Sequence, residues 1–152
     1  MFTNRQGISL FCYVAQNAIY YKKGSIKMAN VPSWPILRQG YSSEVNITAL
    51  QALLNYRNNA GLSLTGLYDT ATSNAVIAYQ NSQSLEADGI AGPDTLSRLV
   101  SNCVIQYGST NIAAYVAQLL LSKFEAITPT GYFDLASDNV YQSISAENGD
   151  NC

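Results

Sequence analysis

Residues 84–99 read SLEADGIAGPDTLSRL, and this stretch decides the fold around it. Asp88-Gly89 predicts a tight turn, because glycine reaches positive φ without steric cost and aspartate can accept hydrogen bonds from its local backbone. Gly92-Pro93 follows three residues later. Since proline has a fixed φ that suits the first turn of a helix, a new helix is predicted to start at Pro93.

Apolar residues recur at helical spacing on both sides of this turn. After it, they are Leu96, Leu99 and Val100. Before it, the sequence TGLYD starts at Thr65 and leads into a helix whose marking residues are Thr72, Ala75, Val76, Tyr79 and Gln80. Asp69 suits the N-cap of that helix.

A further helix is predicted upstream. Ser42 or Ser43 can serve as its N-cap, and Gly61 is a natural stop. Its apolar stripe consists of Val45, Ala49, Leu50, Leu53 and Leu54. The pattern therefore predicts three consecutive helices.

Residues 34–100 resemble the bacterial-type peptidoglycan-binding domain, a small three-helix module appended to wall-lytic enzymes. The resemblance rests on Leu50-Gln51, Leu54, Gly66, Tyr68, Thr72, Ala75-Val76, Tyr79-Gln80, Leu85, Asp88-Gly89-Ile90, Gly92-Pro93, Thr95 and Leu99. Four positions depart from the family. Thr65 stands where aspartate is usual and Asp69 where glycine is usual, while Ser84 replaces a common glycine and Leu96 a common tryptophan.

The resemblance implies an all-α fold in which residues 31–102 form the three-helix bundle. Tyr68 and Tyr79 occupy positions where the family places core aromatic residues. Gln51 and Gln80 also match the family, and we expect each to hydrogen-bond the backbone of a neighbouring loop.

A second, incomplete copy follows the first. TGYFDLASDN from Thr130 echoes TGLYDTATSN from Thr65, and Gln118 matches Gln51. Ahead of it, the first-helix stripe recurs as Ile112, Val116, Leu119, Leu120 and Phe124. Because such self-similarity changes the domain count, residues 103–152 are predicted to form a degenerate, truncated helical repeat that lacks a third helix.

Residues 1–30 fit neither copy and leave three interpretations open. Arg5 followed by the apolar run from Ile8 resembles a secretory signal. The segment can equally be a flexible extension, or translation can naturally start at Met28. A secreted, extracellular protein is the expectation that fits a wall-binding module.

Composition excludes several classes of function. The 152 residues contain no histidine and carry a net charge of −2. Zinc hydrolases need histidine ligands, and serine or cysteine hydrolases normally need a histidine base. These hydrolase classes are therefore excluded, whereas a lysozyme-like mechanism needs only two carboxylates and passes this test. No enzymatic activity, metal or cofactor is expected. The absence of a basic run argues against nucleic acid, and no apolar run approaches the roughly 18 residues of a membrane span.

The three cysteines form no metal-binding pattern. Cys103 begins the second copy and Cys152 ends it, so a disulfide there would close the copy that lacks its last helix. We expect this bridge in an oxidising compartment, with Cys12 free. A reduced pair is the alternative.

Non-catalytic binding of peptidoglycan, through its muropeptides or glycan strands, is the function that the resemblance implies, with a wall-lytic enzyme in trans as a candidate partner. The candidate ligand-binding residues are Tyr68, Asp69, Asp88, Asp94 and Arg98. Two alternatives stay open. The module can be a helical scaffold that kept the fold and lost the ligand, or a muramidase working with paired carboxylates.

Overall fold

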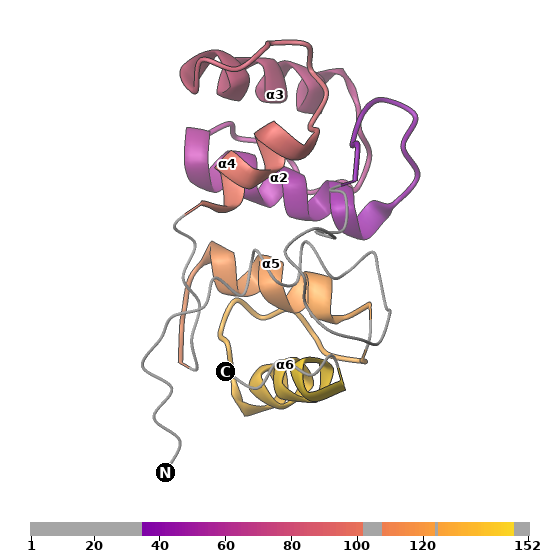
Figure 1. Cartoon of the computed structure of the whole chain (residues 1–152), viewed down its shortest axis with the longest axis vertical. Helices are drawn as coiled ribbons and strands as arrows, with labels where there is room; N and C mark the ends of the chain where they lie inside the picture. The colour runs from indigo at the N-terminus through magenta and orange to yellow at the C-terminus, as the bar shows by residue number, and fades with distance from the viewer. Residues whose placement is uncertain (1–34, 102–107, 124, 148–152) are drawn as a thin grey trace. The chain divides into compact units, whose positions relative to one another are not determined.

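The computed structural model describes residues 35–101, 108–123 and 125–147. They form five helices, and their only β-type pairings are isolated bridges, so the all-α prediction is confirmed for this part of the chain (Figure 1). The described residues fall into two compact units, residues 35–101 and residues 108–147, called here the first and second unit. The expectations for residues 1–30 and for the three cysteines lie outside the described residues.

The first unit is the predicted three-helix bundle. Its helices are α2 (Glu44–Asn58), α3 (Thr70–Ser82) and α4 (Pro93–Val100), and α2 contacts both of the others. The largest fully buried apolar side chains of its core are Ile47, Leu50, Leu54, Val76 and Leu99. Each such side chain contributes about 1.5–3 kcal/mol through removal of apolar surface from water, so the bundle is held mainly by this core.

The ends of α2 differ in detail from the sequence prediction. Ser43 occupies the N-cap position, but its side chain makes no capping hydrogen bond. The helix ends at Asn58, because Asn59 adopts the left-handed conformation at φ 51° and its N–H bonds to the carbonyl of Asn55. Asparagine tolerates this conformation better than most residues, so the predicted stop at Gly61 is wrong by two residues.

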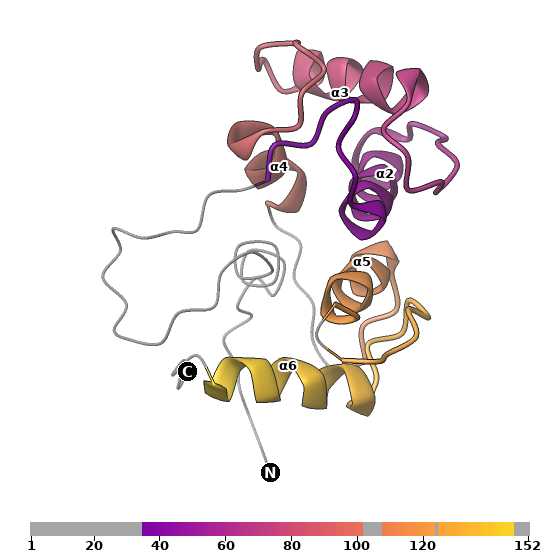
Figure 2. The ribbon, with the colours of Figure 1, turned by 90° about the vertical axis from the view of Figure 1, so that its right-hand side faces the viewer.

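A short lead-in segment, residues 35–43, crosses the bundle before α2 starts. Its Leu37 pairs with Ala91, just before α4, through backbone N···O distances of 3.1 and 2.9 Å. Both residues are buried. Figure 2 shows this segment, in indigo, running from beside α4 towards α2. The bridge thereby places residues from before the first helix next to the turn that follows the second.

The second unit contains α5 (Ile112–Leu121) and α6 (Leu135–Glu147), which contact each other. Asn111 caps α5 by accepting a hydrogen bond from the N–H of Ala114, and Asp134 accepts one from the N–H of Ser137 at the start of α6. The echoed sequence thus folds as the predicted second helix–loop–helix. No helix among the described residues of either unit has the length and apolar character needed to cross a bilayer.

Arg57, at the end of α2, ties that helix to the end of α4. Its Nε donates to the carbonyl of Leu99 at 2.9 Å, and its Nη2 lies against the carbonyl and hydroxyl of Ser101. These carbonyls belong to the last turn of α4, where backbone acceptors have no partner within the helix. The guanidinium therefore completes the C-terminus of α4.

We expect Arg57→Ala to lower the free energy of unfolding by about 1–2 kcal/mol, because several carbonyl acceptors lose a charged donor. Arg57→Lys should retain part of this stability. Urea denaturation measures both, with the exposed Arg38→Ala as the matched control. Equal losses for Arg57→Ala and Arg38→Ala would contradict this role.

Candidate functional site

Three loops are held in the same way by a buried glutamine of the preceding helix. The glutamines are Gln51 on α2, Gln80 on α3 and Gln118 on α5, each no more than 2% exposed. We call residues 65–67, 88–90 and 130–132 the first, second and third anchored loops. Each opens with threonine or aspartate and has glycine at positive φ in its middle.

The same pair of hydrogen bonds recurs in every anchored loop. The glutamine Oε1 accepts from the N–H of the loop glycine at 2.9–3.1 Å. The glutamine Nε2 donates to the carbonyl of the next residue at 2.8–3.1 Å. The prediction that Gln51 and Gln80 bond loop backbone is therefore confirmed, and Gln118 does the same in the second unit.

Two further acceptors complete each anchored loop. The opening residue is Thr65, Asp88 or Thr130; its side-chain oxygen accepts from the glutamine Nε2 and from the N–H two residues on. A hydroxyl seven residues later also lies 2.8–3.1 Å from that Nε2; it belongs to Thr72, Thr95 or Ser137. Threonine and aspartate thus accept the same two hydrogen bonds at the opening position.

Tyr68 supports the second anchored loop from within the bundle. It is 5% exposed, and its hydroxyl donates to the carbonyl of Gly89 at 2.8 Å. Burial raises the pKa of this hydroxyl well above its ordinary value, which keeps the group a hydrogen-bond donor. The structure places this candidate residue behind the loop rather than on the surface.

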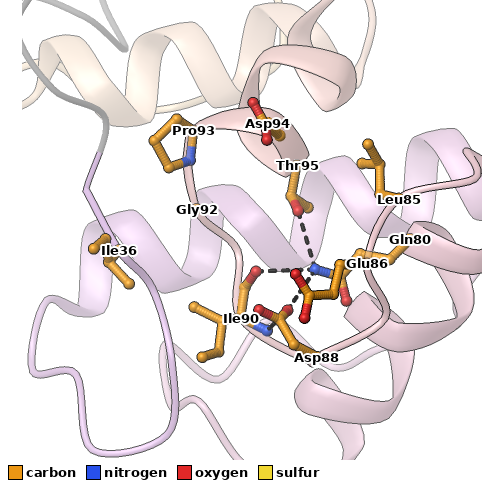
Figure 3. A pocket seen from close by; sticks show the side chains of 10 residues that line it. All are labelled: Ile36, Gln80, Leu85, Glu86, Asp88, Ile90, Gly92, Pro93, Asp94 and Thr95. Carbon is orange, nitrogen blue, oxygen red and sulfur yellow. Dashed lines mark hydrogen bonds between the residues drawn. The ribbon is translucent and has the colours of Figure 1, made fainter.

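A pocket of about 240 Å³ lies beside the second anchored loop (Figure 3). Its wall combines the loop, the start of α4 and the lead-in segment. The lining residues are Ile36, Gln80, Leu85, Glu86, Asp88, Ile90, Gly92, Pro93, Asp94 and Thr95. Four of these side chains are apolar, and three carry carboxylates.

Of the five candidate residues, the pocket brings together Asp88 and Asp94. Asp69 is exposed and caps α3, and its bond from the N–H of Thr72 holds the pKa of its carboxyl below the usual value. Arg98 is exposed on α4 and is not part of the pocket lining. These two residues therefore lie on the first unit without lining its pocket.

The sequence did not indicate the other eight lining residues as parts of a site: Ile36, Gln80, Leu85, Glu86, Ile90, Gly92, Pro93 and Thr95. Three of them, Leu85, Glu86 and Ile90, lie next to the Asp88-Gly89 turn in the sequence, and this proximity could have indicated them. Ile36 gave no such signal, because it reaches the pocket only through the pairing of Leu37 with Ala91.

The chemistry of the pocket is that of a binding surface with hydrogen-bond acceptors and an apolar wall. Among the described residues, no group of three or more histidine, cysteine, aspartate or glutamate side chains could hold a metal ion. The loop itself is fixed by the buried amide of Gln80. The acceptors are therefore presented on a rigid frame, which lowers the entropy lost on binding.

The second anchored loop depends on glycine at position 89. A Cβ there would lie 2.8 Å from the Ser73 hydroxyl and 3.3 Å from Ile77, at φ +72°. Gly61 has a similar φ of +66°, but a Cβ there would meet nothing within 4 Å. Gly89→Ala should therefore destabilise the protein by at least ~1 kcal/mol more than Gly61→Ala. Thermal unfolding of both variants checks this, and similar losses would contradict it.

The threonines of the other two loops predict the outcome at Asp88. Asp88→Thr should change the free energy of unfolding by less than about 0.5 kcal/mol, because threonine accepts the same bonds. Asp88→Ala removes the acceptor of both hydrogen bonds and should lower the free energy of unfolding by about 1 kcal/mol. Chemical denaturation distinguishes the two, and a loss for Asp88→Thr as large as that for Asp88→Ala would show that the loops are not equivalent.

Comparison with known families gives one match. Residues 43–99 match the family model described as "Putative peptidoglycan binding domain". The matched segment starts at the N-cap of α2, includes the first two anchored loops and ends in α4. Comparison with curated proteins and with solved structures gave no match.

Proposed function

We propose that this chain binds bacterial cell-wall peptidoglycan without cleaving it. The proposal starts from the match of residues 43–99 to the peptidoglycan-binding family. The family match is the observation that carries the proposal. It covers α2, α3 and all but the last residue of α4, and it includes every residue that lines the pocket except Ile36.

The pocket beside the second anchored loop is the proposed contact surface. Peptidoglycan presents hydroxyl and amide N–H donors along with methyl and methylene groups. The carboxylates of Glu86, Asp88 and Asp94 supply acceptors for the donors, and Ile36 with Pro93 supplies apolar surface. Small-molecule sites commonly combine apolar walls with a few convergent polar groups in this way.

Binding without cleavage agrees with the structural use of the aspartates. Asp69 and Asp134 cap helices, and Asp88 accepts hydrogen bonds from Gln80 and from the N–H of Ile90. A glycosidase of the paired-carboxylate type needs one acid with a raised pKa beside an ionised partner. Asp69 and Asp134 do not have this property, because hydrogen bonds from the backbone N–H groups of Thr72 and Ser137 lower the pKa of their carboxyls.

A cell-wall setting follows from this proposal. The protein would act outside the cytoplasm and bring whatever acts with it, such as a wall-lytic enzyme in trans, to its polymer. If the module has instead kept its fold and lost the ligand, it would serve as a scaffold. Retention on purified wall separates these two functions.

We expect the purified chain to sediment with insoluble peptidoglycan and to stay in solution with chitin or cellulose. The difference should arise because chitin and cellulose lack the peptide part of the wall. Release of soluble muropeptides would contradict the non-catalytic proposal. Retention on none of the polymers would favour the scaffold, and equal retention on chitin would show that the peptides are not recognised.

Substitution of two exposed aliphatic residues tests where the contact surface lies. Ile36 is 56% exposed and lines the pocket, whereas Leu67 is 68% exposed in the first anchored loop. Ile36→Ser should lower retention about threefold or more through loss of apolar contact, and Leu67→Ser should leave it unchanged. The opposite result would move the surface to the first anchored loop. Melting curves check that both variants are folded.

A further inference from the structure

We propose that the pocket of the first unit selects a protonated amine carried on an aliphatic chain, the group that the diamino acid of a peptidoglycan stem peptide presents. This inference rests on the proposed function and names the part of the wall that the pocket recognises. It places the specificity on the peptide rather than on the glycan.

The three anchored loops provide an internal comparison that separates structural from additional features. Around the second loop, carboxylates occur two residues before the opening position, at that position and six residues after it: Glu86, Asp88 and Asp94. The corresponding residues are Ser63, Thr65 and Ala71 for the first loop, and Thr128, Thr130 and Ala136 for the third. The two other loops form the same hydrogen bonds with neutral residues at all three positions.

The loop structure therefore does not require these charges. At the opening position, a threonine hydroxyl accepts the bonds that one carboxylate oxygen of Asp88 accepts. Asp94 gains from its place in the first turn of α4, where the helix dipole favours an acidic residue. All three carboxylates line the pocket beside this loop, and the other two loops have no carboxylate at the corresponding positions.

The pocket lining has negative charge without a compensating cation. None of its ten residues is lysine or arginine. Arg57 uses its guanidinium on the last carbonyls of α4, and Arg98 is not part of the lining. An anionic ligand would be repelled here, whereas an ammonium group can donate three hydrogen bonds to carboxylate acceptors.

The apolar part of the wall fits the stem of such an amine. Glu86 and Asp88 come from the loop after α3, Asp94 from the first turn of α4, and Ile36 from the lead-in segment (Figure 3). Ile36, Leu85, Ile90 and Pro93 provide surface for methylene groups while the charged end meets the carboxylates. Aliphatic amines pack in this way, with the stem on apolar surface and the head at polar groups.

The test compares untreated peptidoglycan with peptidoglycan whose free amines have been N-acetylated, which removes their charge and leaves the glycan unchanged. The wild-type chain should be retained about threefold to tenfold less on the acetylated wall, as expected for loss of a partly exposed, charge-assisted contact. Equal retention on both walls would overturn this inference and leave the proposed function intact. Retention on neither wall would reject the proposed function itself.

Two variants show whether the effect belongs to the pocket. The triple variant Glu86→Ser, Asp88→Thr, Asp94→Ala copies the first anchored loop and should bind both walls equally and more weakly. The control Glu44→Gln, Glu125→Gln, Asp138→Asn removes the same amount of charge elsewhere and should keep the wild-type difference. If the triple variant still distinguishes the two walls, the pocket does not recognise the amine. Should that variant melt early, Asp94→Ala alone replaces it, with Glu44→Gln as control.

Discussion

The structure depends on a buried amide that satisfies the backbone of a loop. Glycine at positive φ lets each loop turn sharply, but the turn leaves an N–H and a carbonyl facing the protein interior. An unpaired buried polar group costs about 1–3 kcal/mol. Gln51, Gln80 and Gln118 offer one acceptor and one donor on a single planar group, so each meets both needs at once. Helix, loop and following helix are thereby fixed as one piece.

This arrangement leaves the surface of the loop open to variation. Because the backbone is held from behind, the loop tolerates different side chains at its surface, provided that the opening residue keeps an acceptor for the same hydrogen bonds. The second anchored loop carries Glu86 and Asp88 where the first carries Ser63 and Thr65. The same frame therefore carries carboxylates at these positions in one loop and hydroxyl groups in another. The proposed binding and its proposed ligand class both rest on this separation of frame and surface.

Much of the fold was predictable from sequence because its signals are local. The Asp88-Gly89 turn, the start of α4 at Pro93 and the cap at Asp69 each follow from the preferences of a few neighbouring residues. The repeated TG sequence showed the second helix–loop–helix. The end of α2 was missed because two residues competed, and Asn59 took the left-handed conformation before Gly61. At Ser84 the structure explains a sequence pattern. This residue has a φ of 56°, a conformation that glycine adopts easily, and glycine is common at this position in the family.

The candidate site was less predictable, because a pocket is a property of segments that meet in space. The family resemblance supplied Asp88 and Asp94, which do share the pocket, together with Tyr68, Asp69 and Arg98, which do not line it. Local preference could not reveal that a residue before the first helix completes the wall. That information resides in the pairing of Leu37 with Ala91, which are far apart in sequence.

The same pairing has a mechanical consequence. The chain that precedes Pro35 is joined to the pocket directly, through Leu37, and reaches the helices only afterwards. Tension applied from that side would load the two backbone hydrogen bonds to Ala91 before it reached any helix. As those bonds part, Ile36 is drawn off the pocket wall. A tether attached upstream would thus change the proposed contact surface before it loaded any helix.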